Sequence, residues 1–324
     1  MDALYQFGIA LIQFLQNNFS PALDGFMNAF TFMGRIEFYL VLVPFIYWVL
    51  DRRIGIRTFL VLLYVDTIAT SFKLLLHQPR PYWIGDVKPL STETSYGIPS
   101  SHASDSLAVQ GYLASRVKKT WFWVIVVFLV FFISISRLYL GVHFPQDTLF
   151  GWVIGLFVLW TLSQWGDEVV DWFRSASLSA QIGIGFVVSL VIALTGILIR
   201  LIISGIPDPV SWSSFSTQAR SIDHFITLSG ALFGMIAGYA LTRQYARFSA
   251  KGDWGKRLIR YILGIVGLLL LYYGLDLVFS AIAPDETTLG YLLRYIRYGA
   301  ATFWATFLAP WIFLKTRLAD LESG

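Results

Sequence analysis

The sequence has no cysteine and few charged residues. Only 14% of its 324 residues are charged and 56% are hydrophobic, whereas about a quarter of the residues in a soluble domain are charged. Without cysteine the chain has no disulfide, no thiolate metal ligand and no cysteine nucleophile. Its four histidines form no convincing metal-ligand cluster, so we expect neither a metal nor another cofactor. A mean hydropathy of +0.64 predicts a protein embedded in the lipid bilayer.

The positive net charge does not indicate a nucleic-acid partner. The charge is +4, but the basic residues are scattered in short clusters between apolar segments, as signals for membrane orientation are. We therefore expect lipid, and no nucleic acid, as the partner of this chain.

Several stretches have the length of about 20 apolar residues that a helix needs to cross a membrane. We expect an all-α fold, a polytopic transmembrane helical bundle of about nine spans. Two short helices, 4–19 and 20–33, are expected to lie at the membrane interface. The expected spans are 36–50, 54–76, 102–117, 120–138, 147–164, 180–203, 224–242, 261–282 and 291–314.

The connecting segments fall into two sets, because consecutive spans alternate in direction. Most of the basic residues lie in one set, which should face the cytoplasm. They are Arg52, Arg53, Arg57, Arg116, Lys118, Lys119, Arg174, Arg243, Arg247, Lys251, Lys256, Arg257, Arg260, Lys315 and Arg317. The other set comprises 78–101, 139–146, 205–223 and 283–290. We expect a multi-pass protein of the cell membrane with this second set and the N-terminus outside, and with a cytoplasmic C-terminus.

A polar run that begins at Gly166 interrupts the apolar pattern. We expect a domain boundary there. Residues 1–165 would form one membrane domain, which carries all the motifs described below. Residues 166–324 would form a four-span membrane domain whose role the sequence does not indicate.

Ionisable residues gather at the ends of spans on the outward side. A charge placed in lipid costs roughly 2.5–3.5 kcal/mol or more unless it is paired or hydrated, so these residues require an explanation. They occur in three segments, Lys73-x6-Arg80-Pro81, Pro99-Ser100-Ser101-His102 and Ser136-Arg137-x5-His143-x3-Asp147.

These residue types suit phosphoryl transfer. Three of them, Lys73, Arg80 and Arg137, can neutralise phosphoryl oxygens, and Ser100 with the backbone N–H groups that follow can add hydrogen bonds at a helix N-terminus.

Three further residues would carry the chemistry. His143 can attack phosphorus, and Asp147, four residues later on the same helical face, can hold its other nitrogen. His102 can donate a proton to the leaving group, after which water hydrolyses the phosphohistidine.

The three segments, in this order and with these spacings, resemble the signatures of the type 2 phosphatidic acid phosphatase family, which is related to vanadium haloperoxidases. The resemblance covers residues from about 36 to 165. It implies a metal-independent lipid phosphatase with His143 as nucleophile, His102 as general acid and Asp147 as the partner of the nucleophile. It also implies that phosphate is bound by Lys73, Arg80, Ser100, Ser101 and Arg137. The family usually has Gly at the position of Ser101.

Simpler explanations exist for single residues. Lys73 and Arg137 are each compatible with a snorkelling side chain at a helix end, and Asp147 with a helix cap. These explanations do not account for the gathering of all the groups on the less basic side. Trp212 and Phe215, in an outward loop, are expected to cover the site.

The expected substrate is a lipid phosphate or a lipid (polyprenyl) diphosphate, because a lipid headgroup lies at the depth of the motifs. Two alternatives remain open. One is a phosphotransferase of the same family, with a hydroxyl in place of water, and the other is a transporter. The sequence does not indicate which lipid is hydrolysed or the oligomeric state.

Overall fold

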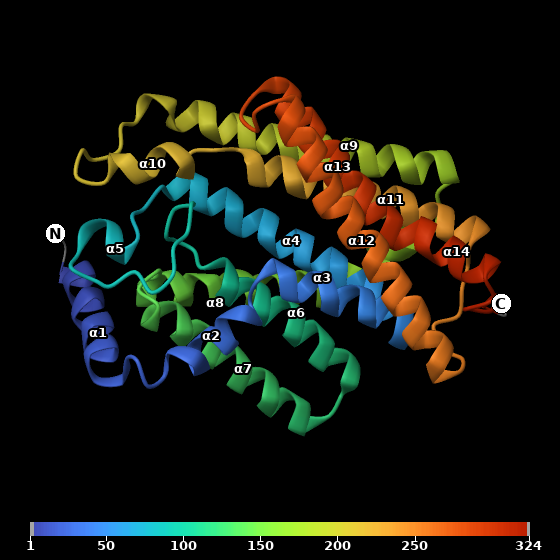
Figure 1. The fold of residues 1–324 in the computed structure, drawn as a ribbon, viewed down its shortest axis with the longest axis horizontal. Coiled ribbons are helices and arrows are strands. Elements are labelled where there is room, and N and C mark those ends of the chain that lie inside the picture. The colour runs from blue at the N-terminus through green and yellow to red at the C-terminus, as the bar shows by residue number, and fades with distance from the viewer. Residues whose placement is uncertain (1–2, 323–324) are drawn as a thin grey trace. The chain divides into compact units, whose positions relative to one another are not determined.

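The protein is built of helices joined by loops (Figure 1). The computed structural model describes residues 3–322, and no strand occurs among them, which confirms the expected all-α fold. The helices are α1 (Ala3–Phe19), α2 (Asp24–Phe32), α3 (Ile36–Phe45), η1 (Ile46–Leu50), α4 (Arg52–Leu76), α5 (Pro81–Ile84), α6 (Ser101–Val117), α7 (Thr120–Tyr139), α8 (Pro145–Ser175), α9 (Leu178–Ile202), η2 (Ile203–Gly205), α10 (Ser213–Ala219), α11 (Asp223–Tyr245), α12 (Trp254–Ile282), α13 (Thr288–Phe303), η3 (Trp304–Leu308) and α14 (Ala309–Lys315).

Within the described residues, six helices are long and apolar enough to cross a membrane, or seven if the bent pair of α2 with α3 and η1 counts as one span. The expected number of nine spans is therefore not confirmed. Helix α6 has 17 residues and α13 has 16, which is less than the length of about 20 that a span needs. The two expected N-terminal helices are present as α1 and α2, and their place at the interface stays a prediction.

The chain forms two compact units, each assembled from separate stretches of sequence. Unit 1 comprises Met1–Tyr39, Tyr64–Gln164 and Gly196–Ser221, and unit 2 comprises Leu40–Leu63, Trp165–Thr195 and Ile222–Gly324. Helix α8 continues past Gly166 as far as Ser175. The domain boundary expected near residue 166 stays a prediction.

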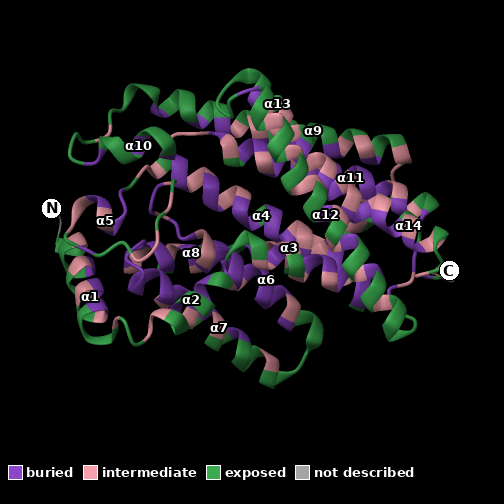
Figure 2. Cartoon of the chain, in the orientation of Figure 1, coloured by how far each residue is buried: buried purple, intermediate pink, exposed green. Residues whose placement is uncertain are grey.

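In unit 1, the N-terminal helices α1 and α2 contact α7. The ring of Phe30 in α2 stacks on Phe132 of α7 with 5.1 Å between centroids. Gln16 of α1 donates its side-chain amide to the Tyr139 carbonyl over 2.9 Å. Figure 2 shows that α6 is largely buried, and its buried residues include many Ala, Ser and Gly. Small side chains allow neighbouring helices to approach closely, as is usual in membranes.

Helix α7 shows how the apolar surface is divided between protein and surroundings. Val126 and Val130 are buried, whereas Val124 and Val127 are 65% and 66% exposed. A helix that is apolar on all sides is typical of a membrane span. The exposed face of α7 is therefore suited to contact with lipid.

In unit 2, three glycines of α11 at intervals of four residues face α13 and η3. A Cβ added to Gly230 would lie 2.3 Å from the Tyr295 carbonyl oxygen, and one added to Gly234 would lie 2.0 Å from the Gly299 carbonyl oxygen. At Gly238 an added Cβ would lie 2.1 Å from Thr306 Oγ1. Glycines at this spacing let two membrane helices pack backbone to backbone.

Candidate active site

His143 lies in the short loop between α7 and α8 and is 2% exposed. Its Nδ1 is 3.2 Å from Asp147 Oδ2, and its Nε2 is 3.2 Å from Arg80 Nη1. A guanidinium only donates hydrogen bonds, so Nε2 must be the accepting nitrogen of a neutral imidazole. The proton then resides on Nδ1 and is donated to Asp147. This tautomer leaves a lone pair on Nε2.

The local sequence explains this geometry. Gly141 has a φ of +74°, which favours glycine, and it turns the chain sharply after α7. Pro145 is the first residue of α8, where its missing N–H and fixed φ are tolerated. Asp147 in the first turn also accepts the Phe144 N–H over 2.9 Å. His143 and Asp147 are thus held by one tight connection.

Lys73 and Arg80 are bound by the backbone that precedes α6. Lys73 Nζ donates to the carbonyls of Tyr96, Gly97 and Pro99, and the last of these bonds is 2.6 Å long. Arg80 Nη2 donates to the same Tyr96 carbonyl over 3.0 Å. Both side chains are buried. A snorkelling lysine keeps its ammonium in water, so this arrangement argues against the simpler explanation for Lys73.

The first turn of α6 carries the second motif. The Ser100 N–H donates to the Asp147 carbonyl over 2.9 Å, which joins α6 to α8. The N–H groups of Ser101 and His102 have no acceptor within their own helix. The His102 ring packs against Gly34, where an added Cβ would lie 2.7 Å from Cδ2.

Arg137, in the last turn of α7, is fully buried. It donates to Thr31 Oγ1 over 2.5 Å and forms an ion pair with Glu93. Burial raises the pKa of Glu93, but Arg137 and Arg80 outweigh this effect and lower the pKa to about 2. The site therefore contains a carboxylate that the sequence motifs do not predict.

The electrostatics around His143 favour a neutral ring. Burial lowers its pKa below the usual value, and the cations Arg80, Lys73 and Arg137 lower it further. A neutral imidazole is the form that can act as a nucleophile.

The structure thus brings the three motifs together within unit 1. Ser101 is the first residue of α6, and its carbonyl accepts the Ser104 hydroxyl over 3.1 Å. Sequence reasoning missed Thr31, Gly34 and Glu93. Glu93 lies in segment 78–101, which is predicted to face outward, and a buried acid could have been sought there to balance the three cations. No local signal distinguishes Thr31 or Gly34.

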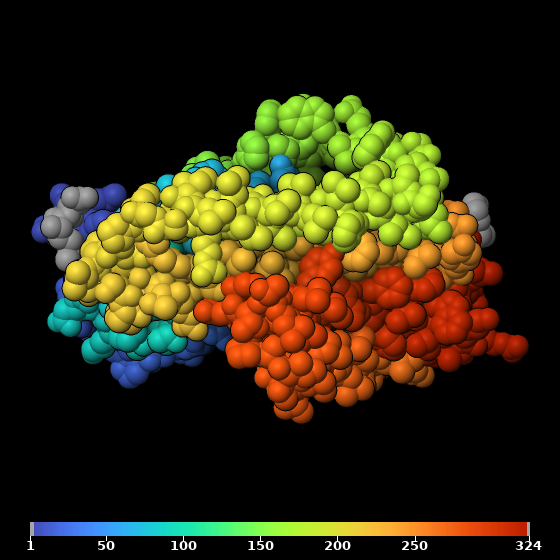
Figure 3. Space-filling model, turned by 90° about the horizontal axis from the view of Figure 1, so that it is seen from above, coloured from blue at the N-terminus to red at the C-terminus, as the bar shows by residue number. Residues whose placement is uncertain are grey.

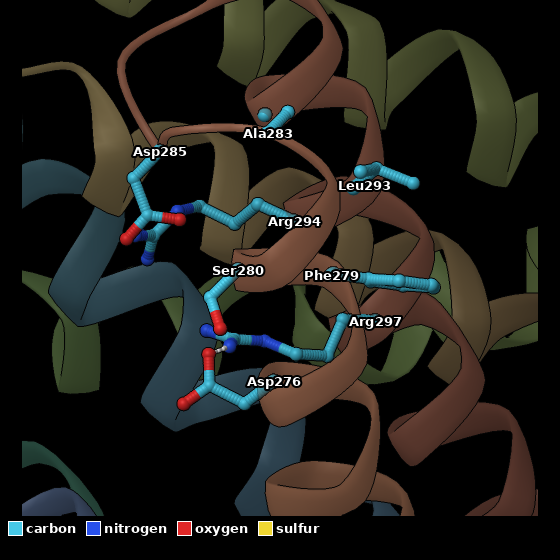
Figure 4. Close-up of a pocket in the computed structure, with 9 residues that line it drawn as sticks. Asp276, Phe279, Ser280, Ala283, Asp285, Leu293, Arg294 and Arg297 are labelled. Atoms are coloured by element: carbon cyan, nitrogen blue, oxygen red, sulfur yellow. Dashed lines mark hydrogen bonds and ion pairs between the residues drawn. The ribbon is translucent and has the colours of Figure 1, made fainter.

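Unit 2 contains a small pocket at the ends of α12 and α13 (Figure 4). Its arginines face carboxylates, as Figure 4 shows for Arg297 and Asp276. Arg294 donates to Asp285 over 2.8 Å and to Asp223 over 3.3 Å. We interpret these as ion pairs that stabilise unit 2. Throughout residues 3–322, no group of three or more His, Cys, Asp or Glu is arranged to hold a metal ion.

Two family models match the chain. The model of the PAP2 superfamily matches residues 55–171, which contain the three motifs. A second model, described as PAP2 superfamily phosphatase, transmembrane extension, matches residues 226–321.

Two similar proteins differ in how much of the chain they cover. The glucose-6-phosphatase catalytic subunit 1 of Mus musculus is 25% identical, over 96% of this chain and 95% of its own length. Lipid phosphate phosphatase delta of Arabidopsis thaliana is also 25% identical, over 47% of this chain and 40% of its own length. A solved structure, the transmembrane PAP2 type phosphatidylglycerolphosphate phosphatase of Bacillus subtilis, has a TM-score of 0.45 and 23% identity, and covers 52% of this chain and 89% of that one.

Proposed function

We infer from the two family matches, which together cover most of the chain, that it belongs to the PAP2 superfamily, and we propose that it hydrolyses a phosphate ester through a phosphohistidine on His143. His102 acts as the general acid, Asp147 orients the nucleophile, and Lys73, Arg80, Ser100, Ser101 and Arg137 bind the phosphoryl group. We propose residues 1–165 as the catalytic domain, and the PAP2 match to 55–171 supports a catalytic role for most of this stretch.

One observation carries this proposal. Ser100 Oγ, His102 Nε2 and Arg137 Nε are buried and have no hydrogen-bond partner in the described part of the chain. Buried polar atoms normally have partners. These atoms belong to the second and third motifs, and His143 accepts a hydrogen bond from Arg80 of the first motif. A phosphoryl group with its ester oxygen would be a suitable partner for all of them.

The first half of the reaction forms the phosphohistidine. The lone pair of His143 Nε2 forms the N–P bond while the bond between phosphorus and the ester oxygen breaks. Arg80, which now contacts Nε2, turns its N–H groups to a phosphoryl oxygen. Burial and Arg137 lower the pKa of His102, and the negative charge of a bound phosphoryl group opposes this effect, so that His102 can carry a proton in the complex. The departing oxygen takes that proton, and the charge that develops on His143 is stabilised by Asp147.

The second half returns the enzyme to its starting state. His102, now neutral, removes a proton from water as its oxygen attacks phosphorus. The N–P bond breaks, its electron pair returns to Nε2, and inorganic phosphate leaves. None of these steps requires a metal. Metal independence is therefore part of the proposal, and the assay below tests it.

A lipid phosphate or lipid diphosphate in the outer leaflet of the cell membrane is our first candidate substrate. It is supported by the apolar helices α4, α7 and α8, which carry Lys73, Arg137 and Asp147, and by relatives named for lipid phosphates. A soluble sugar phosphate is a second candidate, because the similarity to glucose-6-phosphatase extends over nearly the full chain. That similarity weakens the argument that membrane embedding by itself indicates a lipid substrate.

Phosphate release by the purified full-length protein in detergent tests the proposal. Phosphatidate, phosphatidylglycerol phosphate, a sphingoid phosphate, a polyprenyl diphosphate and glucose 6-phosphate serve as substrates. Activity that is lost in His143→Ala and survives EDTA is the expected result. Full activity in His143→Ala contradicts the phosphohistidine, and activity that EDTA removes and one divalent ion restores contradicts metal independence. Release that requires an added hydroxyl acceptor indicates a phosphotransferase.

A further inference from the structure

Tyr96 links the two cations of the first motif. Its carbonyl accepts Lys73 Nζ over 3.2 Å and Arg80 Nη2 over 3.0 Å. Both side chains are buried and contact the backbone from Ser95 to Pro99. A shift of Tyr96 would therefore move both cations relative to His143.

The Tyr96 side chain is held by residues far along the sequence. Its hydroxyl donates to Asp208 Oδ2 over 2.9 Å, and Arg220 Nε donates to the same oxygen over 2.7 Å. Arg220 also donates to the carbonyls of Ile203 and Ile206. Burial opposes the charge on Asp208, but hydrogen bonds led by that from Arg220 lower its pKa below the usual value. Asp208 is thus an anchored, ionised acceptor for Tyr96.

The same segment packs on α5, which directly follows Arg80. The ring of Phe215 stacks on Trp83 with 5.4 Å between centroids and 6° between planes, and Trp212 lies on Trp83 at 5.7 Å. Trp212 also meets the Tyr96 ring edge-on at 6.3 Å. In Figure 3 the yellow atoms of this segment adjoin the blue-green atoms of the region around α5. Trp212 and Phe215 therefore pack on residues that flank the first two motifs.

We propose that residues 206–221, the clamp segment, complete the active site by holding Tyr96, with Asp208 and Arg220 as positioning residues for Lys73 and Arg80. The clamp segment belongs to unit 1 with the three motifs. It lies between the two family models, which end at residue 171 and begin again at residue 226. This inference rests on the proposed function, and it assigns a role in catalysis to part of the chain beyond the PAP2 match.

Asp208→Asn in the full-length protein tests the role of the clamp segment. The variant keeps the shape of the side chain, but it replaces the charge-assisted bond from Arg220 by a weaker one to a neutral acceptor, so the side chain holds Tyr96 less firmly. Tyr96→Phe removes only the donor to Asp208, and the double variant reports whether the two act together. Asp276→Asn is the matched control, because it also removes a carboxylate that pairs with a buried arginine, Arg297, but lies in unit 2.

Two measurements separate positioning from simple loss of stability. Orthovanadate mimics the phosphoryl group during transfer. The two measurements are its inhibition constant and the rise in the thermal midpoint of the protein when it binds. We expect Asp208→Asn to lose about 10- to 100-fold in kcat/KM and a comparable factor in vanadate affinity. The double variant should be no worse than the more affected single variant. Asp276→Asn should keep the wild-type vanadate affinity whatever its thermal midpoint without ligand.

The outcomes distinguish the two proposals. If wild type releases phosphate and binds vanadate but Asp208→Asn does so equally well, the role of the clamp segment is wrong and the proposed function stands. If Asp208→Asn and Asp276→Asn lose the same factor, the effect is general destabilisation and the inference is also wrong. If wild type neither releases phosphate nor responds to vanadate, the proposed function fails and the inference fails with it.

Discussion

Replacement of Asp147 by Asn and by Ala separates two contributions of this residue. In the structure one oxygen, Oδ2, accepts both the Phe144 N–H over 2.9 Å and His143 Nδ1 over 3.2 Å. The carbonyl oxygen of Asn can accept both bonds in the same way. Asp147→Asn therefore keeps the orientation and tautomer of His143 and removes only the negative charge, whereas Asp147→Ala removes both.

The magnitudes follow from the strengths of hydrogen bonds. A bond to a charged group is worth about 1.5–3 kcal/mol and a neutral one about 0.5–1.5 kcal/mol. The difference of about 1–2 kcal/mol acts when His143 becomes positive, and at 1.36 kcal/mol for each factor of ten it lowers kcat about 5- to 30-fold. In serine proteases an Asp→Asn substitution costs about 10⁴-fold because it leaves the imidazole in the wrong tautomer. At Asp147 the Phe144 N–H and His143 Nδ1 share one acceptor oxygen, so the amide oxygen of Asn should face His143 and keep its tautomer, whereas Asp147→Ala leaves the tautomer unspecified. We expect a loss of at least about 10³-fold there.

Steady-state phosphate release with saturating substrate measures both effects, together with trapping of the phosphoenzyme, which as a phosphohistidine should survive in base and be hydrolysed in acid. His143→Ala defines the background rate. Equal losses in Asp147→Asn and Asp147→Ala would show that the amide does not reproduce both hydrogen bonds, and the reasoning from the shared oxygen would fail. A wild-type rate in Asp147→Asn would show that the charge contributes nothing.

Three further predictions follow from burial and close contacts. Because burial and nearby cations lower the pKa of His143, its neutral form persists to lower pH. The acid limb of the pH profile of kcat/KM, corrected for ionisation of the substrate, should therefore lie below the usual histidine pKa of about 6.5. An acid limb at or above that pH contradicts this prediction. Gly34→Ala would place a Cβ 2.7 Å from the ring of His102, so kcat should fall about tenfold or more with a smaller change in the vanadate inhibition constant; unchanged kcat would refute the close contact. Gly234→Leu should lower the thermal midpoint by separating α11 from α13, whereas Gly274→Ala, where nothing lies within 4 Å of an added Cβ, should leave it unchanged; equal midpoints for the two variants would argue against the glycine contact.

Much of the site was accessible from the sequence because its spacings are local. The separation of four residues predicts that His143 and Asp147 lie within reach of each other, and they do, although His143 lies in the loop two residues before α8 and only Asp147 lies in the helix. The cost of unpaired charge near lipid explains why Lys73, Arg80 and Arg137 required a common ligand or partner. Their phosphate-binding roles stay predictions, but the residues do lie in one unit.

The number of spans was less accessible. Composition alone determined that the chain is helical and embedded in lipid, because a backbone in lipid must satisfy its hydrogen bonds internally. Hydropathy did not decide how α6, α13 and the bent pair of α2 and α3 should be counted. The glycine spacing in α11 was visible in the sequence, but its partner helix was not.

Only the tertiary structure decided which distant residues surround the motifs. Glu93 and Thr31 meet Arg137 across 44 and 106 residues of sequence, and Asp208 meets Tyr96 across 112. No periodicity connects positions so far apart, since these contacts depend on how the helices of unit 1 pack. The sequence by itself indicated the lipid surroundings, the all-α fold class and the ionisable side chains of the three motifs, because these depend on composition and local spacing. Packing decided which partners hold those groups in place.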